Sequence, residues 1–180
     1  MMVWYETERL ILRNYKEKDT EDYYEYMSLE STALHEDFYP FSQEESRRAV
    51  EERLQDDSYW VVELKQNSKV IGDVCYRKGE YDTYEITYDF NEEYGKKGYA
   101  TEACRVLLRH IFTVLKGRRL YAGCNEENKA SWRLLERLGM RREAHCLEDM
   151  AFKTDEAGTP IYVNSYYYAL LKKEWEQKEL

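Results

Sequence analysis

The chain has 180 residues, with 36 acidic against 27 basic side chains and a net charge of -9. This length is typical of one domain, and no linker-like stretch or internal repeat interrupts the sequence, so we expect a single domain over residues 1–180. The negative charge argues against nucleic acid or an anionic membrane as a partner of the whole surface.

Cysteine usage and hydropathy limit the class of protein further. The four cysteines show no CxxC pairing and no zinc-like spacing, which predicts reduced thiols, no metal site and a cytoplasmic location. The longest uncharged run, residues 157–171, is too short and too polar to span a bilayer, which takes about 20 apolar residues. Glu6 and Glu8 stand where a secretory signal needs apolar residues.

Strand and helix signals alternate in the first half of the chain. Residues 9–15 form an apolar run that predicts the first strand. Asp19 is expected to cap a helix, and Ser42 with Glu45 three residues later is a capping box for a helix that reaches about Leu54. Three strands are predicted next, over residues 60–64, 69–76 and 83–90.

Helical periodicity begins at residue 98 and runs to about residue 115. The apolar positions on one face of this helix are Ala103, Leu107, Ile111 and Val114. Gly117 is placed to end the helix in a left-handed cap. Residues 119–124 predict a buried strand, and Asn128 caps a helix that Gly139 stops. The last two strands are expected near residues 145–152 and over residues 160–171, which completes a mixed α/β (α+β) sheet with helices packed on it.

Positive charge is concentrated in residues 95–119, which hold seven basic residues and one acidic residue. A Gly-Lys-Lys-Gly turn at residues 95–98 follows a strand that ends at Asn91, and a helix starts directly after it. The N–H groups at a helix start have no partners within the helix, and the helix dipole favours an anion there. The pattern therefore predicts a diphosphate site. It matches neither GxxxxGK[ST] nor GxGxxG, which argues against a kinase or a dinucleotide-binding protein.

Five motifs in order along the chain carry a family resemblance. They are TERLILR at residues 7–13, GYATEA at 98–103, NKAS at 128–131, LERLGM at 135–140 and YALLKKEW at 168–175. Together they resemble the GNAT acetyltransferase superfamily, and more narrowly its branch of ribosomal-protein N-terminal (RimJ/RimL-like) acetyltransferases. The resemblance implies a single GNAT-like acyl-CoA N-acyltransferase fold with a central, mostly antiparallel sheet flanked by helices.

The resemblance also implies an activity. The acetyl group of acetyl-CoA, the co-substrate, passes to a primary amine of a protein N-terminus or a small molecule, by direct attack in a ternary complex. Backbone groups of the strand over residues 84–91 would pair with the pantetheine arm, and one N–H would polarise the thioester carbonyl. The implied cofactor-binding residues are Tyr88, Phe90, Gly95, Lys96, Lys97, Gly98, Tyr99, Ala100, Thr101, Asn128 and Ser131. Gly95 stands where the family pattern has Gln or Arg.

Two residues are candidates for catalysis. Glu85, on the polar face of the strand before the loop, is the first candidate for the general base, acting through water. His35 and His145 are rival bases. Many GNAT enzymes protonate the departing thiolate with a tyrosine where this chain has Leu135, and the RimJ/RimL-like branch has a serine where Ser131 stands. The structural alternatives are an exposed strand carboxylate for Glu85 and helix capping for the region of Ser131.

The acceptor and the assembly state are left open by the sequence. Residues 16–57 hold fourteen acidic and five basic residues, which favours a basic peptide or a polyamine-like amine if these carboxylates flank the acceptor entrance. Solvated helix surface explains most of them equally well. A non-catalytic acyl-CoA-binding or regulatory module is the alternative function, because Leu135 cannot protonate a thiolate. Both a monomer and a homodimer are compatible with the sequence.

Overall fold

A computed structural model describes residues 4–178, and the chain divides into two compact units. Unit 1 contains Met1–Leu34, Tyr39–Arg77 and Ile86–Leu107. Unit 2 contains His35–Phe38, Lys78–Glu85 and Leu108–Leu180. Strand β5 (Thr83–Phe90) and helix α4 (Tyr99–Thr113) each contribute residues to both units.

Eight strands make up the sheet of the described chain, in the order β1-β2-β3-β4-β5-β6-β8-β7. Besides β5 they are β1 (Trp4–Glu6), β2 (Leu10–Asn14), β3 (Tyr59–Leu64), β4 (Val70–Lys78), β6 (Arg119–Asn125), β7 (Arg141–Thr154) and β8 (Pro160–Leu171). The helices besides α4 are α1 (Thr20–Met27), α2 (Glu30–Ala33), α3 (Gln43–Arg53), α5 (Lys129–Arg137) and α6 (Lys172–Lys178). The pairs β1–β2, β2–β3, β3–β4, β6–β8 and β7–β8 are antiparallel, whereas β5 and β6 run parallel over Thr83–Glu85. The mixed, mostly antiparallel sheet that the sequence predicts is confirmed.

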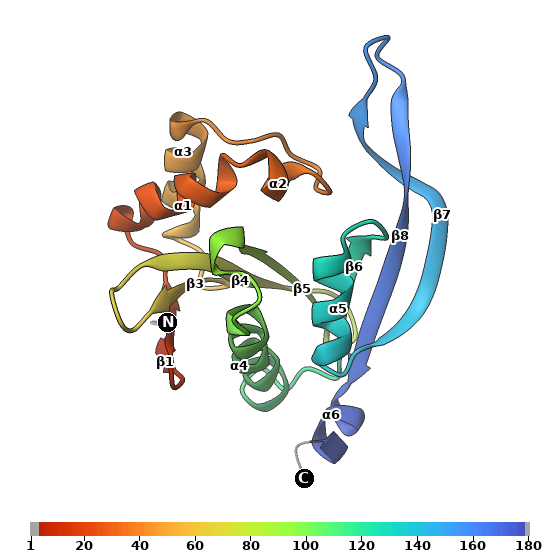
Figure 1. The fold of residues 1–180 in the computed structure, drawn as a ribbon. Coiled ribbons are helices and arrows are strands. Elements are labelled where there is room, and N and C mark those ends of the chain that lie inside the picture. Colours follow the sequence, from red (N-terminus) through yellow and green to blue (C-terminus); the bar gives the residue numbers. More distant parts are fainter. Residues whose placement is uncertain (1–3, 179–180) are drawn as a thin grey trace. The chain divides into compact units, whose positions relative to one another are not determined.

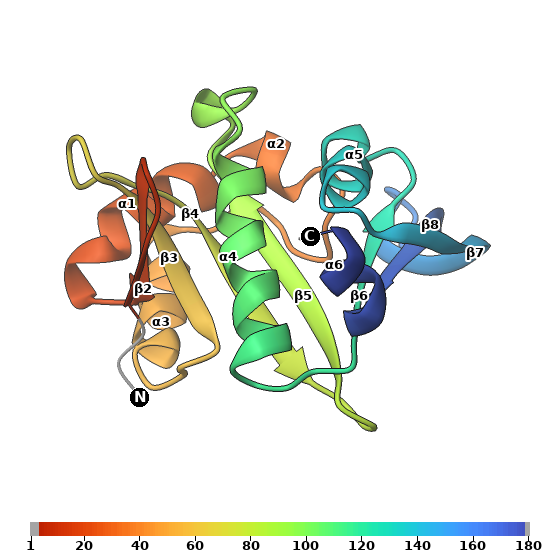
Figure 2. The same ribbon diagram turned by 90° about the horizontal axis from the view of Figure 1, so that it is seen from below.

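Unit 1 places helices on both faces of its strands. Helices α1 and α3 cover one face of β3 and β4, and the first half of α4 covers the other (Figure 1, Figure 2). Its core contains Leu12, Tyr23, Trp60, Val62 and Ile71, all fully buried. β2 and β3 are near-continuous apolar runs, and successive residues of each strand are buried, so both faces of these strands are covered.

The two helix starts predicted in unit 1 differ in outcome. Ser42 caps α3 as expected, because its Oγ accepts from Glu45 N at 3.3 Å and its own N donates to the Glu45 carboxylate at 2.8 Å. Asp19 occupies the N-cap position of α1 as predicted, but its side chain makes no cap bond to that helix. That carboxylate accepts from the Arg13 guanidinium at 2.7 Å and 2.8 Å and from Lys16 N at 2.8 Å. A buried ion pair has taken the place of the cap.

Unit 2 is built on the long β7–β8 hairpin, which pairs with β6 through β8 (Figure 1). Helix α5 packs on β6 and β8, and α6 packs on the end of β8. The Trp175 ring of α6 lies 5.3 Å from the Phe112 ring at the end of α4. The turn between the hairpin strands uses Gly158, whose φ is 79°.

Helix α4 ends differently from the sequence expectation. The left-handed residue is Lys116, with φ 59°, and not Gly117. Gly117 is needed for space instead, because a Cβ there would lie 2.7 Å from Ile111 Cγ2 and 3.0 Å from Tyr84 Cδ2. Val114 is 54% exposed because α4 ends at Thr113, so it does not extend the apolar face. Gly139, with φ 81°, does end α5 as predicted.

Short or terminal elements were missed by the sequence analysis. Strand β1, helix α2 and helix α6 were not predicted, and β7 begins four residues before the expected start at residue 145. All four cysteines carry free thiols, as expected. Among the described residues, no helix is both long enough and apolar enough to cross a bilayer.

Candidate functional site

The loop before α4 lies in unit 1 and is formed by an exposed glycine-lysine turn. A short 3-10 helix (Glu92–Tyr94) precedes it, and Gly95–Gly98 are exposed. Lys96 and Gly98 have left-handed backbones, with φ of 59° and 83°. The first bond of α4 runs from Glu102 N to Gly98 O at 3.0 Å. The N–H groups of Tyr99, Ala100 and Thr101 precede that bond, so the helix itself offers them no backbone acceptor.

Arg9 holds this loop from the start of the chain. Its Nη1 donates to the Lys97 carbonyl at 2.9 Å, and its Nε donates to Glu102 Oε2 at 2.8 Å. Thr7 Oγ1 donates to the other carboxylate oxygen of Glu102 at 2.5 Å. The Arg9 guanidinium also stacks on the Tyr99 ring, 4.4 Å from its centroid. These contacts link residues 7–9 to the turn and to the first turn of α4, which fixes the conformation of the loop.

Strands β4 and β5 approach closely on the same unit. A Cβ at Gly72 would lie 2.4 Å from the Asp89 carbonyl oxygen and 2.6 Å from Phe90 Cδ1, so only glycine fits there. Asn91 continues this contact, since its N donates to Ile71 O at 2.9 Å. Tyr88 and Phe90 are partly buried on this part of β5, and both belong to unit 1 together with the loop.

Glu85 lies on the part of β5 that belongs to unit 2. It pairs with Tyr121 of β6 in the parallel ladder and is partly buried. Its negative charge helps to raise the pKa of the Tyr167 phenol on β8, after burial and the Asp149 carboxylate. Glu85 is therefore near Tyr167 within unit 2.

The start of α5 brings Asn128, Ser131 and Cys124 together in unit 2. Asn128 Oδ1 accepts from Ser131 N at 3.1 Å, so Asn128 is the cap that the sequence predicts. The Ser131 side chain hydrogen-bonds the Cys124 thiol. Burial nevertheless raises the pKa of Cys124 to about 11, so the thiol is protonated at neutral pH. Both Asn128 and Ser131 are partly buried.

Glu36 joins this group, although the sequence analysis did not single it out. Asn128 Nδ2 donates to Glu36 Oε1 at 3.5 Å. Burial, with help from the Asp37 charge, raises the pKa of Glu36 to about 7, against the opposing effects of Asn128 and Lys153. One acidic residue among fourteen in residues 16–57 gives no local signal of such a contact. Only the fold brings it to Asn128.

The two rival bases, His35 and His145, also belong to unit 2. His145 Nε2 is 2.5 Å from Glu126 Oε2, and its ring lies 4.8 Å from the Tyr166 ring. Burial lowers the pKa of His35, against the charge of Glu127, which raises it. Leu135 is fully buried, so it belongs to the core of unit 2.

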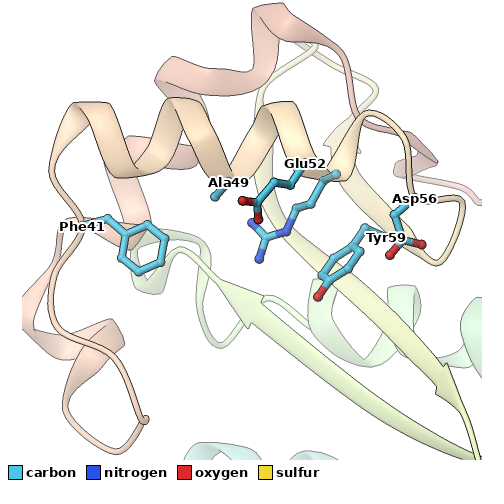
Figure 3. A pocket seen from close by; sticks show the side chains of 6 residues that line it. Phe41, Ala49, Glu52, Asp56 and Tyr59 are labelled. Carbon is cyan, nitrogen blue, oxygen red and sulfur yellow. The ribbon is translucent and has the colours of Figure 1, made fainter.

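A cavity of about 350 Å³ opens in unit 1 beside α3 (Figure 3). Its lining residues are Phe41, Ala49, Glu52, Arg53, Asp56 and Tyr59. Phe41 and Tyr59 lie at opposite ends of it, and the Glu52 carboxylate lies between them (Figure 3). The Arg53 guanidinium stacks 4.6 Å from the Tyr23 ring and 4.7 Å from the Tyr59 ring. The cavity thus combines aromatic walls, a cation and exposed carboxylates.

Many acidic residues of the segment 16–57 already have cationic partners. Asp19 pairs with Arg13, Asp22 and Glu25 both pair with Lys69 at 2.9 Å and 2.6 Å, and Glu44 pairs with Arg47 at 2.6 Å. These pairs reduce the negative field that the sequence alone suggests. Glu52 and Asp56 at the cavity are exposed.

Comparisons with known proteins identify the family. The model of the acetyltransferase (GNAT) domain matches residues 9–141. The uncharacterized N-acetyltransferase YnaD of Bacillus subtilis strain 168 is 33% identical over 172 residues, which cover 94% of this chain and 97% of that protein. This chain belongs to the GNAT family of N-acetyltransferases.

Solved structures agree with this assignment. The GNAT-family acetyltransferase of Bacillus anthracis superposes with a TM-score of 0.85 at 31% identity, over 96% of this chain and all of that one. The spermidine N-acetyltransferase of Vibrio cholerae, solved with CoA and spermine, shares the fold with a TM-score of 0.78 at 20% identity. It covers 94% of this chain and 99% of that one. The GNAT resemblance of the sequence is therefore confirmed.

Proposed function

We propose that this chain transfers the acetyl group of acetyl-CoA to a primary amine, on a protein N-terminus or a small molecule, by direct attack in a ternary complex. The proposal includes its membership of the RimJ/RimL-like branch, which the motifs at residues 7–13 and 168–175 favour. It also includes one domain over residues 1–180 and a cytoplasmic location.

The tethered loop at residues 95–98 is the observation that carries the proposal. Glycine at a left-handed position lets the backbone approach a ligand, and the start of α4 favours negative charge. Lys96 and Lys97 add two positive charges on an exposed turn. These features fit a diphosphate, which Gly95 to Thr101 would bind through backbone N–H groups. When bound, acetyl-CoA supplies an activated acyl carbon and a thiolate leaving group.

The close approach of β4 and β5 supports a position of the acyl group beside these two strands. Gly72 leaves no room for a side chain against Asp89, which sets the spacing of the two strands. In the proposed complex the pantetheine arm follows β5 near Tyr88 and Phe90. A backbone N–H of this strand would then donate to the oxygen on which negative charge develops.

The start of α5 supplies the proposed proton donor. Ser131 would give its hydroxyl proton to the departing sulfur, and Asn128 would hold the pantetheine arm while it caps the helix. Leu135 is buried and carries no proton, so the serine one turn earlier takes this role. Glu85 on β5 and Glu36 beside Asn128 are the two proposed bases, either of which would take the proton of the acceptor.

The cavity beside α3 is the proposed acceptor entrance of unit 1. Its exposed Glu52 and Asp56 carboxylates suit an ammonium group, and Phe41 and Tyr59 suit the carbon chain that carries it. The spermidine acetyltransferase with the same fold was solved with spermine, a polyamine. We therefore place polyamines and basic N-terminal peptides first among the acceptors.

Release of free thiol from acetyl-CoA tests the activity. The acceptors are spermidine, a basic peptide with a free N-terminus, the same peptide with an acetylated N-terminus, and an amino acid. We expect saturable thiol release with an unblocked amine and none with the blocked peptide, whose product is identified by its added acetyl mass. The non-catalytic module, favoured by the buried Leu135, predicts saturable CoA binding without thiol release for every amine.

A further inference from the structure

Glu36 reaches unit 2 on a short excursion of the chain. His35–Phe38 lie between α2 and α3, yet they cluster with unit 2, whereas the residues on either side of them belong to unit 1. The Asn128 amide donates to Glu36 Oε1, and its own oxygen accepts from Ser131 N. One amide side chain therefore links the Glu36 carboxylate to the first turn of α5, across 92 positions of sequence.

The surroundings of this carboxylate are unlike those of a structural ion pair. Asp37 on its own segment repels it, while Lys153 of β7 attracts it, and the Glu36 charge in turn helps burial to raise the pKa of the Cys124 thiol of β6. Desolvation exceeds the attraction, which keeps the pKa of Glu36 at about 7. The buried Asp19 carboxylate, by contrast, lies 2.7 Å from the Arg13 guanidinium, whereas no cation lies at ion-pair distance from Glu36 among the described ion pairs.

Proton-transfer groups gather around the same amide. Ser131 lies on one side of Asn128 and Glu36 on the other, so a proton acceptor and a hydroxyl donor share one neighbour. An acyl transfer to an amine requires both, because the ammonium has to lose a proton and the departing sulfur has to gain one. Glu85, the base expected from the sequence, instead lies in the β5–β6 ladder near Tyr167.

We propose that Glu36 is the general base that takes the proton from the ammonium group of the acceptor. This proposal rests on the acetyl transfer proposed above. The Glu36 carboxylate accepts one proton, the nitrogen lone pair forms the bond to the acyl carbon, and the bond from that carbon to sulfur breaks. The nitrogen loses two protons in all, of which one is balanced by protonation of the sulfur and one leaves to water.

The test compares the pH dependence of kcat/KM in the full-length protein, its Glu36→Gln and Glu85→Gln variants, and Glu30→Gln, an exposed carboxylate of α2, as the matched control. The acceptor is whichever of spermidine and the basic free peptide releases thiol. We expect the wild-type and Glu30→Gln rates to rise with pH and to level off near pH 7. Glu36→Gln should lose this rise and show a 100-fold to 1,000-fold lower kcat/KM at pH 7, with CoA binding within about twofold of wild type.

A second readout separates a base from a structural residue. Above the pKa of the acceptor amine, the nucleophile is already deprotonated in water, so the deficit of Glu36→Gln should shrink at least tenfold. If Glu36→Gln keeps the wild-type rise while Glu85→Gln loses it, Glu36 is not the base although the enzyme transfers acetyl groups. An equal deficit at all pH values also overturns the proposal. If the wild type binds CoA and acetylates neither acceptor, the acetyl transfer itself fails, and the assignment of Glu36 fails with it.

Discussion

Arg9, which directly precedes β2, and Glu102, in the first turn of α4, form an ion pair with Nη2 and Oε2 2.6 Å apart. The pair crosses 93 positions of sequence and joins two of the family motifs. Arg9 also donates to the Lys97 carbonyl, so the pair controls the loop as well as the helix. The Arg9–Glu102 pair therefore helps to set the shape of the proposed diphosphate site.

Replacing Arg9 by alanine should therefore weaken CoA binding more than it weakens folding. The ion pair is partly exposed, so the loss of unfolding free energy should stay below about 1 kcal/mol. We expect the Kd for CoA, measured by calorimetry, to rise about threefold to tenfold as the loop loses its tether. Lys65→Ala, which removes an ion pair to Glu6 elsewhere in unit 1, is the control and should leave this Kd unchanged. An unaltered Kd in Arg9→Ala would show that the loop keeps its shape without the tether.

Gly98→Ala and Gly158→Ala form a matched pair of backbone variants. Both glycines have left-handed φ values, 83° and 79°, so each alanine should destabilise the fold by about 1 kcal/mol in chemical denaturation. Only Gly98 lies in the loop, and only its variant should raise the Kd for CoA. The Gly158 variant has the same strain in the β7–β8 turn, where no atom lies within 4 Å of the added Cβ. Equal Kd values for the two variants would contradict the loop assignment.

Ser131→Ala should lower kcat about tenfold or more and leave the Kd for CoA nearly unchanged. The alanine keeps the N–H that bonds Asn128, so the cap of α5 survives and the loss is confined to the hydroxyl. Steady-state thiol release and CoA calorimetry measure the two quantities. Ser28→Ala at the end of α1 is the control, because its hydroxyl donates to the Glu25 carbonyl in its own helix turn. Wild-type turnover in Ser131→Ala would remove this serine from the mechanism.

Glu36→Gln should stabilise the protein in alkaline solution. The pKa of Glu36 is about 7 in the folded chain and about 4.3 in an unfolded one, so the folded state binds more protons between these values. Stability contributed by this group therefore falls as the pH rises from 4 to 7. The glutamine removes that loss, which amounts to at most about 4 kcal/mol. Urea unfolding at pH 5 and pH 8 should show a gain for the variant at pH 8 that is small at pH 5.

Periodic patterns predicted most of the fold. The apolar alternation of β5 and the helical face of α4 gave both elements close to their observed bounds, and Ser42 with Glu45 gave the start of α3. Asp19 stands at the N-cap position of α1 as predicted, but its carboxylate accepts from the Arg13 guanidinium instead of a helix N–H. The prediction of a left-handed cap at Gly117 was wrong, because glycine is required there by the lack of space beside Ile111 and Tyr84 and not by the backbone angle.

The candidate site was predicted in part. Glycine, charge and helix start identify the loop at residues 95–98 locally, and Asn128 is visible as a cap. The tether from Arg9 and the contact between Glu36 and Asn128 depend on residues more than 90 positions apart. No local pattern encodes such contacts, so only the folded chain reveals them.

The excursion of His35–Phe38 has a consequence for dividing the gene. A fragment that begins at residue 78, the last residue of β4, contains the C-terminal hairpin and α5 but lacks residue 36. Co-expressing residues 1–77 with residues 78–180 would supply the missing carboxylate only if the two pieces reassemble. Complementation by the two fragments would thus show that His35–Phe38 of the first fragment associate with the second, because neither fragment alone holds both Glu36 and Asn128.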